Sequence, residues 1–168
     1  MDKVQAISKA EFHSHNIEET LNLGRSIGRM AEPGQCIALD GPLGVGKTQL
    51  VRGIAVGAKA ADPSIVNSPT YVLLNVYEPA QDEEAKTVFH LDAYRVRDSA
   101  QFAAIGFDEL LEQGGVVVLE WASRVPDLLP EDHLQITGEI IDENNRLWSV
   151  TAQGPFSIQL LGKLSRNT

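Results

Sequence analysis

The chain has 168 residues, which is enough for one domain of ordinary size. With 43% hydrophobic and 22% charged residues, its composition is that of a folded globular domain and argues against a disordered chain. A net charge of -9 disfavours direct binding to the phosphate backbone of DNA or RNA. The single cysteine, Cys36, excludes an intramolecular disulfide framework and a multi-cysteine metal site.

Neither a membrane span nor a secretory signal is predicted. The longest apolar runs, such as Val116–Leu119, have four residues, whereas a membrane-spanning helix needs about 20. The first residues, Met1–Gln5, lack the apolar stretch of a secretory signal. We therefore expect a cytoplasmic protein that has no membrane partner and folds as a single domain over residues 1–168.

Hydrophobic periodicity and turn residues predict alternating helices and strands. Asn16 and Glu19 fit a capping box at the start of the first helix. The predicted elements are a helix over 17–31, a strand over 36–39, a Gly-rich loop over 41–46, a helix ending near Gly57, strands over 71–78 and 87–92 that suit an antiparallel hairpin, a helix over 99–113 broken at Gly106, a strand over 116–121, two strands within 133–152 and a helix over 156–164. This alternation predicts an α/β domain.

The Gly-rich segment 41–48 satisfies the nucleotide-binding pattern G-x-x-x-x-G-K-S/T in full. Its glycines let the backbone curl around a phosphate, and the helix that follows contributes the positive end of its dipole. Lys47 is expected to reach the β- and γ-phosphates, and the Thr48 hydroxyl is a natural ligand for Mg²⁺. The expected nucleotide-binding residues are Gly41, Leu43, Gly44, Val45, Gly46, Lys47 and Thr48. The loop predicts a single P-loop NTPase domain with a central mixed β-sheet flanked by helices.

Two acidic residues follow apolar strands and are candidates for the rest of a P-loop site. Asp92 follows Val88–Leu91, and Glu120 follows Val116–Leu119. Open α/β sheets place ligand chemistry at such strand ends. One acid can hold Mg²⁺ while the other orients water or acts as a base, and the sequence leaves open which does which. An ordinary acidic strand end is the alternative for either residue.

Other residues near these motifs have two interpretations each. Thr70, in the segment Ser-Pro-Thr over 68–70, can reach a metal or γ-phosphate and act as a switch, although Ser-Pro also favours a plain turn. His90 is interpreted as a packed histidine rather than a ligand. Trp121 can stack on a base or a partner, but packing is the simpler interpretation. Cys36 is expected in the core.

Four short motifs in register resemble the TsaE (YjeE) family, small bacterial P-loop ATPases required for threonylcarbamoyladenosine formation in tRNA. They are Gly-x-Leu-Gly-x-Gly-Lys-Thr over 41–48, Ser-Pro-Thr-Tyr over 68–71, His-Leu-Asp-Ala-Tyr-Arg over 90–95 and Leu-Glu-Trp over 119–121. The resemblance implies Lys47 and Thr48 at phosphate and metal, Thr70 on a switch loop, Asp92 as the metal-side acid and Glu120 as the second acid with Trp121 beside it. Gln49 departs from the family, which usually has a second hydroxyl residue there, and Pro42 stands where an acid is common.

The resemblance also implies a function: ATP and Mg²⁺ as cofactors, ATP hydrolysis that is weak without partners, the protein partners TsaB and TsaD, and tRNA reached only through them. A small-molecule P-loop kinase is one alternative, but residues 126–145 contain no arginine or lysine for a phosphate-neutralising lid. A GTPase is disfavoured because the guanine-reading Asn-Lys-x-Asp string is absent. A nucleotide-sensing module without turnover is the non-enzymatic alternative.

Overall fold

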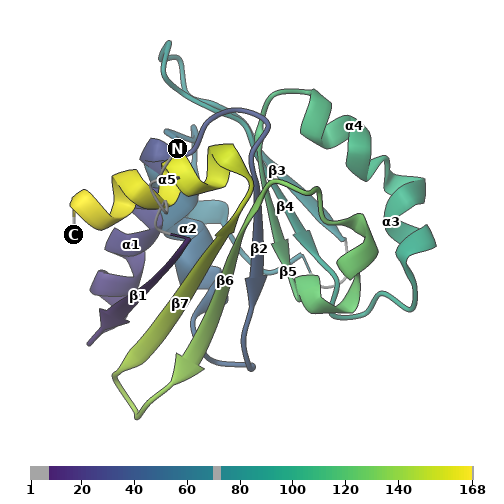
Figure 1. Ribbon diagram of the computed structural model, residues 1–168. Helices are drawn as coiled ribbons and strands as arrows, with labels where there is room; N and C mark the ends of the chain where they lie inside the picture. The colour runs from purple at the N-terminus through teal and green to yellow at the C-terminus, as the bar shows by residue number, and fades with distance from the viewer. Residues whose placement is uncertain (1–7, 70–72, 168) are drawn as a thin grey trace, which may run out of the picture.

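The computed structural model describes residues 8–69 and 73–167, and Figure 1 shows them arranged around one central β-sheet. Within these residues the sheet has seven strands in the order β1-β7-β6-β2-β5-β4-β3. The strands are β1 (Lys9–Ser14), β2 (Cys36–Asp40), β3 (Leu74–Tyr77), β4 (Val88–Asp92), β5 (Val116–Glu120), β6 (His133–Ile140) and β7 (Arg146–Gln153). Strands β6, β2, β5 and β4 run parallel, whereas β1, β7 and β3 pair antiparallel with their neighbours. The predicted mixed sheet is confirmed.

Helices cover both faces of the sheet and give three layers (Figure 1). On one face lie α1 (Ile17–Met30), α2 (Lys47–Gly57) and α5 (Pro155–Arg166), and on the other α3 (Ser99–Ile105) and α4 (Phe107–Glu112). Ile37 and Ile54 belong to the core of the first face, and Phe102 and Leu119 to the core of the second. Because both faces are covered, the central strands are apolar on both sides and have continuous apolar sequences. Among the described residues, no helix is long and apolar enough to cross a membrane.

Most elements lie where the hydrophobic pattern predicts them. The strands expected over 87–92 and 116–121 are β4 and β5, and the helix over 99–113 is divided into α3 and α4. Gly106 joins these two helices with φ of 83°, a left-handed conformation that glycine adopts readily. The hairpin of β3 and β4 is confirmed, although residues 71–72 of the predicted strand lie outside the described residues.

The sequence analysis did not predict four of the described elements. Strand β1 pairs with β7 at the edge of the sheet, where exposed and partly buried residues alternate along Lys9–Ser14 and only Ala10 and Phe12 are apolar. Three single-turn 3-10 helices occupy Pro63–Ile65, Ala122–Arg124 and Pro126–Leu128. These short segments have no periodic pattern long enough to recognise, because one helical turn gives no repeat.

Helices α1 and α2 make a backbone-to-backbone contact through glycines from both helices. A Cβ atom placed on Gly28 would lie 2.0 Å from the carbonyl oxygen of Ile54, and one on Gly53 would lie 2.3 Å from that of Leu21. Asn16 caps the N-terminus of α1, and its side chain accepts a hydrogen bond from the Glu19 amide as predicted. The Glu19 carboxylate, however, accepts from the amide of His15 rather than from that of Asn16.

This contact predicts a large cost for any side chain at Gly28. In Gly28→Ala the new methyl group meets rigid backbone, so α1 and α2 must separate, and we expect the free energy of unfolding to fall by about 3 kcal/mol. Gly162→Ala is the matched control, because a Cβ atom on this α5 residue has nothing within 4 Å, and it should raise the stability by up to about 1 kcal/mol. Urea unfolding measures both values. Equal stability of the Gly28→Ala variant and the wild type would contradict the described contact.

Candidate functional site

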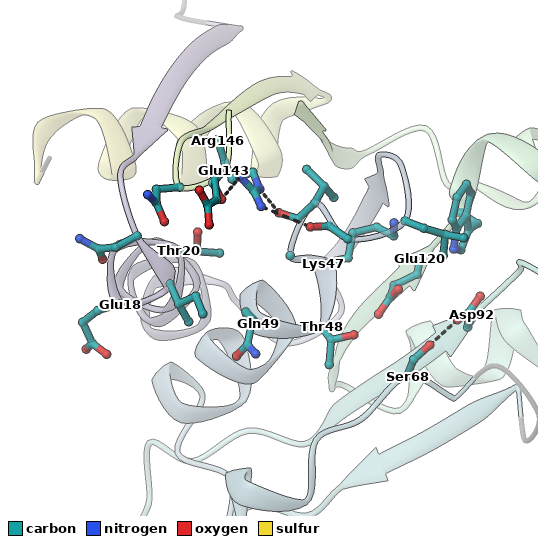
Figure 2. Close-up of a pocket in the computed structure, with 18 of the residues that line it drawn as sticks. Glu18, Thr20, Lys47, Thr48, Gln49, Ser68, Asp92, Glu120, Glu143 and Arg146 are labelled. Carbon is teal, nitrogen blue, oxygen red and sulfur yellow. Dashed lines mark hydrogen bonds between the residues drawn. The ribbon is translucent and has the colours of Figure 1, made fainter. Parts of the chain in front are cut away.

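A cavity of about 1110 Å³ opens beside the Gly-rich loop (Figure 2). Its walls come from the loop and the start of α2, the N-terminal turn of α1, the β6–β7 turn, and the ends of β4 and β5. The lining residues used below are Asn16, Ile17, Thr20, Gly44, Val45, Gly46, Lys47, Thr48, Ser68, Asp92, Tyr94, Glu120, Trp121 and Arg146. The cavity therefore lies at the carboxyl ends of parallel strands, where α/β sheets bind ligands.

The loop between β2 and α2 has the backbone of an anion-binding loop. Gly44 and Gly46 have φ of 80° and 110°, values that favour glycine. Gly46 is the N-cap of α2 and has no side chain to accept hydrogen bonds from the first turn. The N–H groups of that turn and the helix dipole are therefore available to a phosphate. Asp40 anchors the entry of the loop, since its carboxylate accepts hydrogen bonds from Ser123 and Gln135.

Lys47 lines the cavity and contacts the loop itself. Its Nζ donates to the carbonyl oxygens of Gly41 at 2.6 Å and Pro42 at 3.0 Å. The same atom lies 4.2 Å from the ring centroid of Trp121. Burial lowers the pKa of Lys47, and the carboxylates of Glu120 and Asp92 act in the opposite direction. A bound phosphate would replace these carbonyl oxygens as the acceptor of the Lys47 hydrogen bonds. The ammonium group is therefore already positioned for an anion.

The two acids predicted from the strand ends lie side by side. Asp92 and Glu120 are paired in the β4–β5 register, and both residues are at most 2% exposed. The Asp92 carboxylate accepts from Ser68 Oγ and from the Tyr94 amide, each at 2.7 Å. The Glu120 carboxylate lies 2.7 Å from His90 Nε2. The two acids thus have different partners, one on the loop that precedes β3 and the other on β4.

Thr48, Asp92 and Glu120 together form an oxygen donor set that fits Mg²⁺. Figure 2 shows Thr48, Glu120 and the Ser68–Asp92 pair around one part of the cavity. Mg²⁺ in nucleotide sites takes a hydroxyl, one or two carboxylates and phosphate oxygens, and keeps several waters. Ser68 of the predicted switch segment lies at this end, whereas Thr70 lies outside the described residues.

An aromatic pair covers the Lys47 end of the cavity. The rings of Tyr94 and Trp121 have centroids 5.0 Å apart, and the Arg124 guanidinium lies 5.2 Å from the Tyr94 centroid. Trp121 has φ of 58°, an uncommon conformation for a large side chain, and its amide donates to Leu39 of β2. Residues held in such conformations cluster at functional sites. Packing explains only part of the Trp121 environment, since the ring also lines the cavity.

Arg146 is a site residue that the sequence analysis did not predict. It begins β7, and its guanidinium donates to Val45 O of the loop at 3.0 Å and to Asp142 O of the β6–β7 turn at 2.8 Å. Arg146 thereby ties the turn to the loop from a position 101 residues away. The sequence offered one indication of this role: Arg146 is the first arginine or lysine after Arg124.

The start of α1 also enters the site without a sequence motif. Asn16, Ile17 and Thr20 line the cavity, and Figure 2 shows Thr20 on the side opposite Glu120 and Asp92. The helix pattern located α1, but the contact with the loop depends on how α1 packs against α2. His90, interpreted from the sequence as a packed histidine, is fully buried. Its Nε2 also contacts the Glu120 carboxylate.

The strand, the Gly-rich loop and the helix that starts at Lys47 define a P-loop α/β domain with two buried acids beside the loop. The sequence profile described as "Threonylcarbamoyl adenosine biosynthesis protein TsaE" matches residues 14–148. The chain therefore belongs to the TsaE family, which functions in the biosynthesis of threonylcarbamoyladenosine in tRNA. This confirms the family that the four motifs indicated.

Similar proteins support the same assignment. The tRNA threonylcarbamoyladenosine biosynthesis protein TsaE of Bacillus subtilis is 31% identical over 161 residues, 96% of this chain and 97% of that protein. The protein of the same name from Treponema pallidum is 35% identical over 133 residues, 79% of this chain and 93% of that protein. A crystal structure of Bacillus subtilis YdiB superposes with a TM-score of 0.76 and 27% identity over 95% of both chains.

The contacts of Arg146 predict a role in holding the loop shape. In Arg146→Ala the loop loses its bond to the β6–β7 turn, and we expect nucleotide affinity to fall about tenfold, the effect of one hydrogen bond from a charged donor. Arg146→Lys should recover part of the loss, because a single ammonium can reach only some of these carbonyls. Calorimetric titration with ATP and Mg²⁺ measures the change. The exposed Arg166 of α5 provides a control, and an Arg146→Ala affinity equal to that of Arg166→Ala would exclude this role.

Proposed function

We propose that this chain binds ATP with Mg²⁺ and hydrolyses it to ADP and phosphate within the machinery that forms threonylcarbamoyladenosine in tRNA. The observation that carries the proposal is the meeting of Lys47 with Asp92 and Glu120 in one cavity at the P-loop. A lysine for the phosphates, a hydroxyl and an acid for the metal, and a second acid for water are the parts that P-loop hydrolysis requires. The family supports the tRNA pathway.

Each residue then has a distinct task. The loop amides and Lys47 hold the β- and γ-phosphates, and Lys47 balances charge that develops on the leaving oxygen. Thr48 and Asp92 would hold Mg²⁺, which neutralises phosphate charge when bound. Glu120 orients the attacking water and accepts its proton as the bond from the γ-phosphorus to the bridging oxygen breaks. Trp121 lies against Lys47 and therefore flanks the phosphates rather than the base.

The protein partners of this reaction would be TsaB and TsaD, with tRNA reached only through them. The family places the chain in a pathway whose substrate is tRNA, yet a net charge of -9 opposes direct contact with a polyanion. A subunit that acts on protein partners reconciles these two facts. Hydrolysis by the isolated chain would be weak, and its place of work would be the cytoplasm.

Two variants separate binding from chemistry. Lys47→Ala should weaken ATP binding about ten- to a hundredfold, because it removes a charge-assisted contact to the phosphates. Glu120→Gln should bind ATP as the wild type does and hydrolyse it much more slowly, since only the carboxylate charge is lost. Calorimetry and release of labelled phosphate measure the two effects. Identical ATP titrations of wild type and Lys47→Ala would refute the site, and normal hydrolysis by Glu120→Gln would refute the role of the second acid.

Nucleotide-dependent partner binding is a further expectation. Ser68 contacts Asp92 at the metal end of the cavity, so a γ-phosphate with its metal would favour one conformation of this loop. A ligand that prefers one conformation changes partner affinity by the same free energy. We expect the affinity for the TsaB–TsaD pair to differ between ATP and ADP, and no tRNA binding by the isolated chain at about 0.15 M salt. Equal affinities with ATP, ADP and no nucleotide would contradict the switch, and a tRNA gel shift by the chain alone would contradict the charge argument.

A further inference from the structure

A buried hydrogen-bonded chain leads from β3 through β4 to Glu120. His90 precedes Asp92 by two residues on β4, so both side chains lie on the sheet face that carries the P-loop. His90 Nε2 lies 2.7 Å from Glu120 Oε1, and His90 Nδ1 lies 2.9 Å from the hydroxyl of Tyr77. His90 is 0% exposed and Tyr77 is 3% exposed. Water therefore has no access to replace these contacts.

The protons of this chain can be assigned from its partners. An ionised Glu120 carboxylate accepts only, so His90 Nε2 must carry a proton. Burial raises the pKa of Tyr77, which keeps its hydroxyl protonated. That hydroxyl lies 2.9 Å from His90 Nδ1 and 3.4 Å from Asn67 O. The shorter contact favours donation to Nδ1, which places the imidazole proton on Nε2.

We propose that His90 is a positioning residue for Glu120, with Tyr77 holding the imidazole in the Nε2–H tautomer. The Nε2–H bond fixes Oε1 of the carboxylate and directs Oε2 at the cavity, where the attacking water lies. The inference rests on the proposed hydrolysis, because Glu120 acts on that water. It adds that the Glu120 carboxylate acts on the water only when the Nε2–H donor of His90 sets its orientation. The hydrogen bond at Nδ1 in turn determines which nitrogen of His90 carries the proton.

A second buried histidine, His133, has a different environment in the same protein. His133 at the start of β6 is 7% exposed, and its Nδ1 contacts the carbonyl oxygen of Pro130. It faces no carboxylate of the cavity and does not line it. His133→Leu is therefore the matched control for the loss of a buried histidine.

Steady-state hydrolysis distinguishes positioning from packing. His90→Leu fills the space without a donor and should lower kcat about 10- to 100-fold with KM and ATP affinity unchanged, the cost of a misplaced catalytic group. His90→Gln, whose amide nitrogen takes the place of Nε2, should restore most of kcat. Tyr77→Phe should lower kcat about three- to tenfold, because the imidazole remains but its tautomer is no longer fixed. His133→Leu should keep the wild-type kcat. A wild-type kcat in His90→Leu, or an equal loss in His90→Gln and His90→Leu, would overturn the proposal.

The Glu120→Gln background tests whether His90 acts through Glu120. If it does, adding His90→Leu to Glu120→Gln causes no further loss of single-turnover hydrolysis, because the carboxylate that His90 orients is already gone. The full 10- to 100-fold loss in the double variant would show that His90 acts elsewhere and would overturn the proposal. Labelled ATP with enzyme in excess makes these slow rates measurable.

A readout independent of hydrolysis is the tautomer of His90. Long-range proton–nitrogen NMR of the 15N-histidine protein should show a protonated Nε2 and an unprotonated Nδ1 for His90, with the signals of His133 assigned by His133→Leu. In Tyr77→Phe the Nδ1–H form should become populated. A Nδ1–H tautomer or an imidazolium in the wild type would overturn the proposal. If the wild type shows this tautomer but neither binds nor hydrolyses ATP, the proposed function fails while the contact of His90 stands.

Discussion

The site depends on the direct contact between the backbones of α1 and α2. Glycines at 24, 28, 53 and 57 remove the side chains that would separate the helices, and a Cβ atom on any of them would overlap a backbone oxygen of the other helix. Helices normally pack with axes about 8–10 Å apart because side chains lie between them. Here the absence of those side chains brings the first turn of α1, with Asn16 and Thr20, to the edge of the P-loop cavity.

The second requirement is that two buried carboxylates be stable beside each other. An unpaired buried carboxylate costs several kcal/mol, and two adjacent ones also repel. Each acid here accepts hydrogen bonds, Asp92 from Ser68 and Tyr94, and Glu120 from His90. The Lys47 ammonium attracts both. Each acid therefore has hydrogen-bond partners and a nearby cation that compensate for its burial.

Sequence reasoning predicts those parts of the protein whose signal is local. The P-loop needs a fixed order of residues, and β4 and β5 need apolar runs that end in an acid, so Lys47, Asp92 and Glu120 could be found before the structure was known. Arg146 could not, because its role comes from the register of β6 and β7, which brings it to Val45 from 101 positions away. His90 was found but assigned to packing, since the sequence does not show that Glu120 lies on the neighbouring strand within hydrogen-bond distance of its Nε2. The edge strand β1 was missed because its alternation rests on two apolar residues, Ala10 and Phe12.

The hydrogen bonds of both acids lead to one short segment before β3. Ser68 donates to Asp92 directly. The carbonyl oxygen of its neighbour Asn67 lies 3.4 Å from the hydroxyl of Tyr77. That hydroxyl contacts His90, and His90 contacts Glu120. A displacement of this segment would therefore alter the surroundings of Asp92 and of Glu120 together. Such coupling between Asp92 and Glu120 requires a continuous set of contacts and a segment that can adopt two conformations. If the conformation of this segment depends on the γ-phosphate, one movement would change the surface that a partner binds and also the geometry of the groups proposed for hydrolysis.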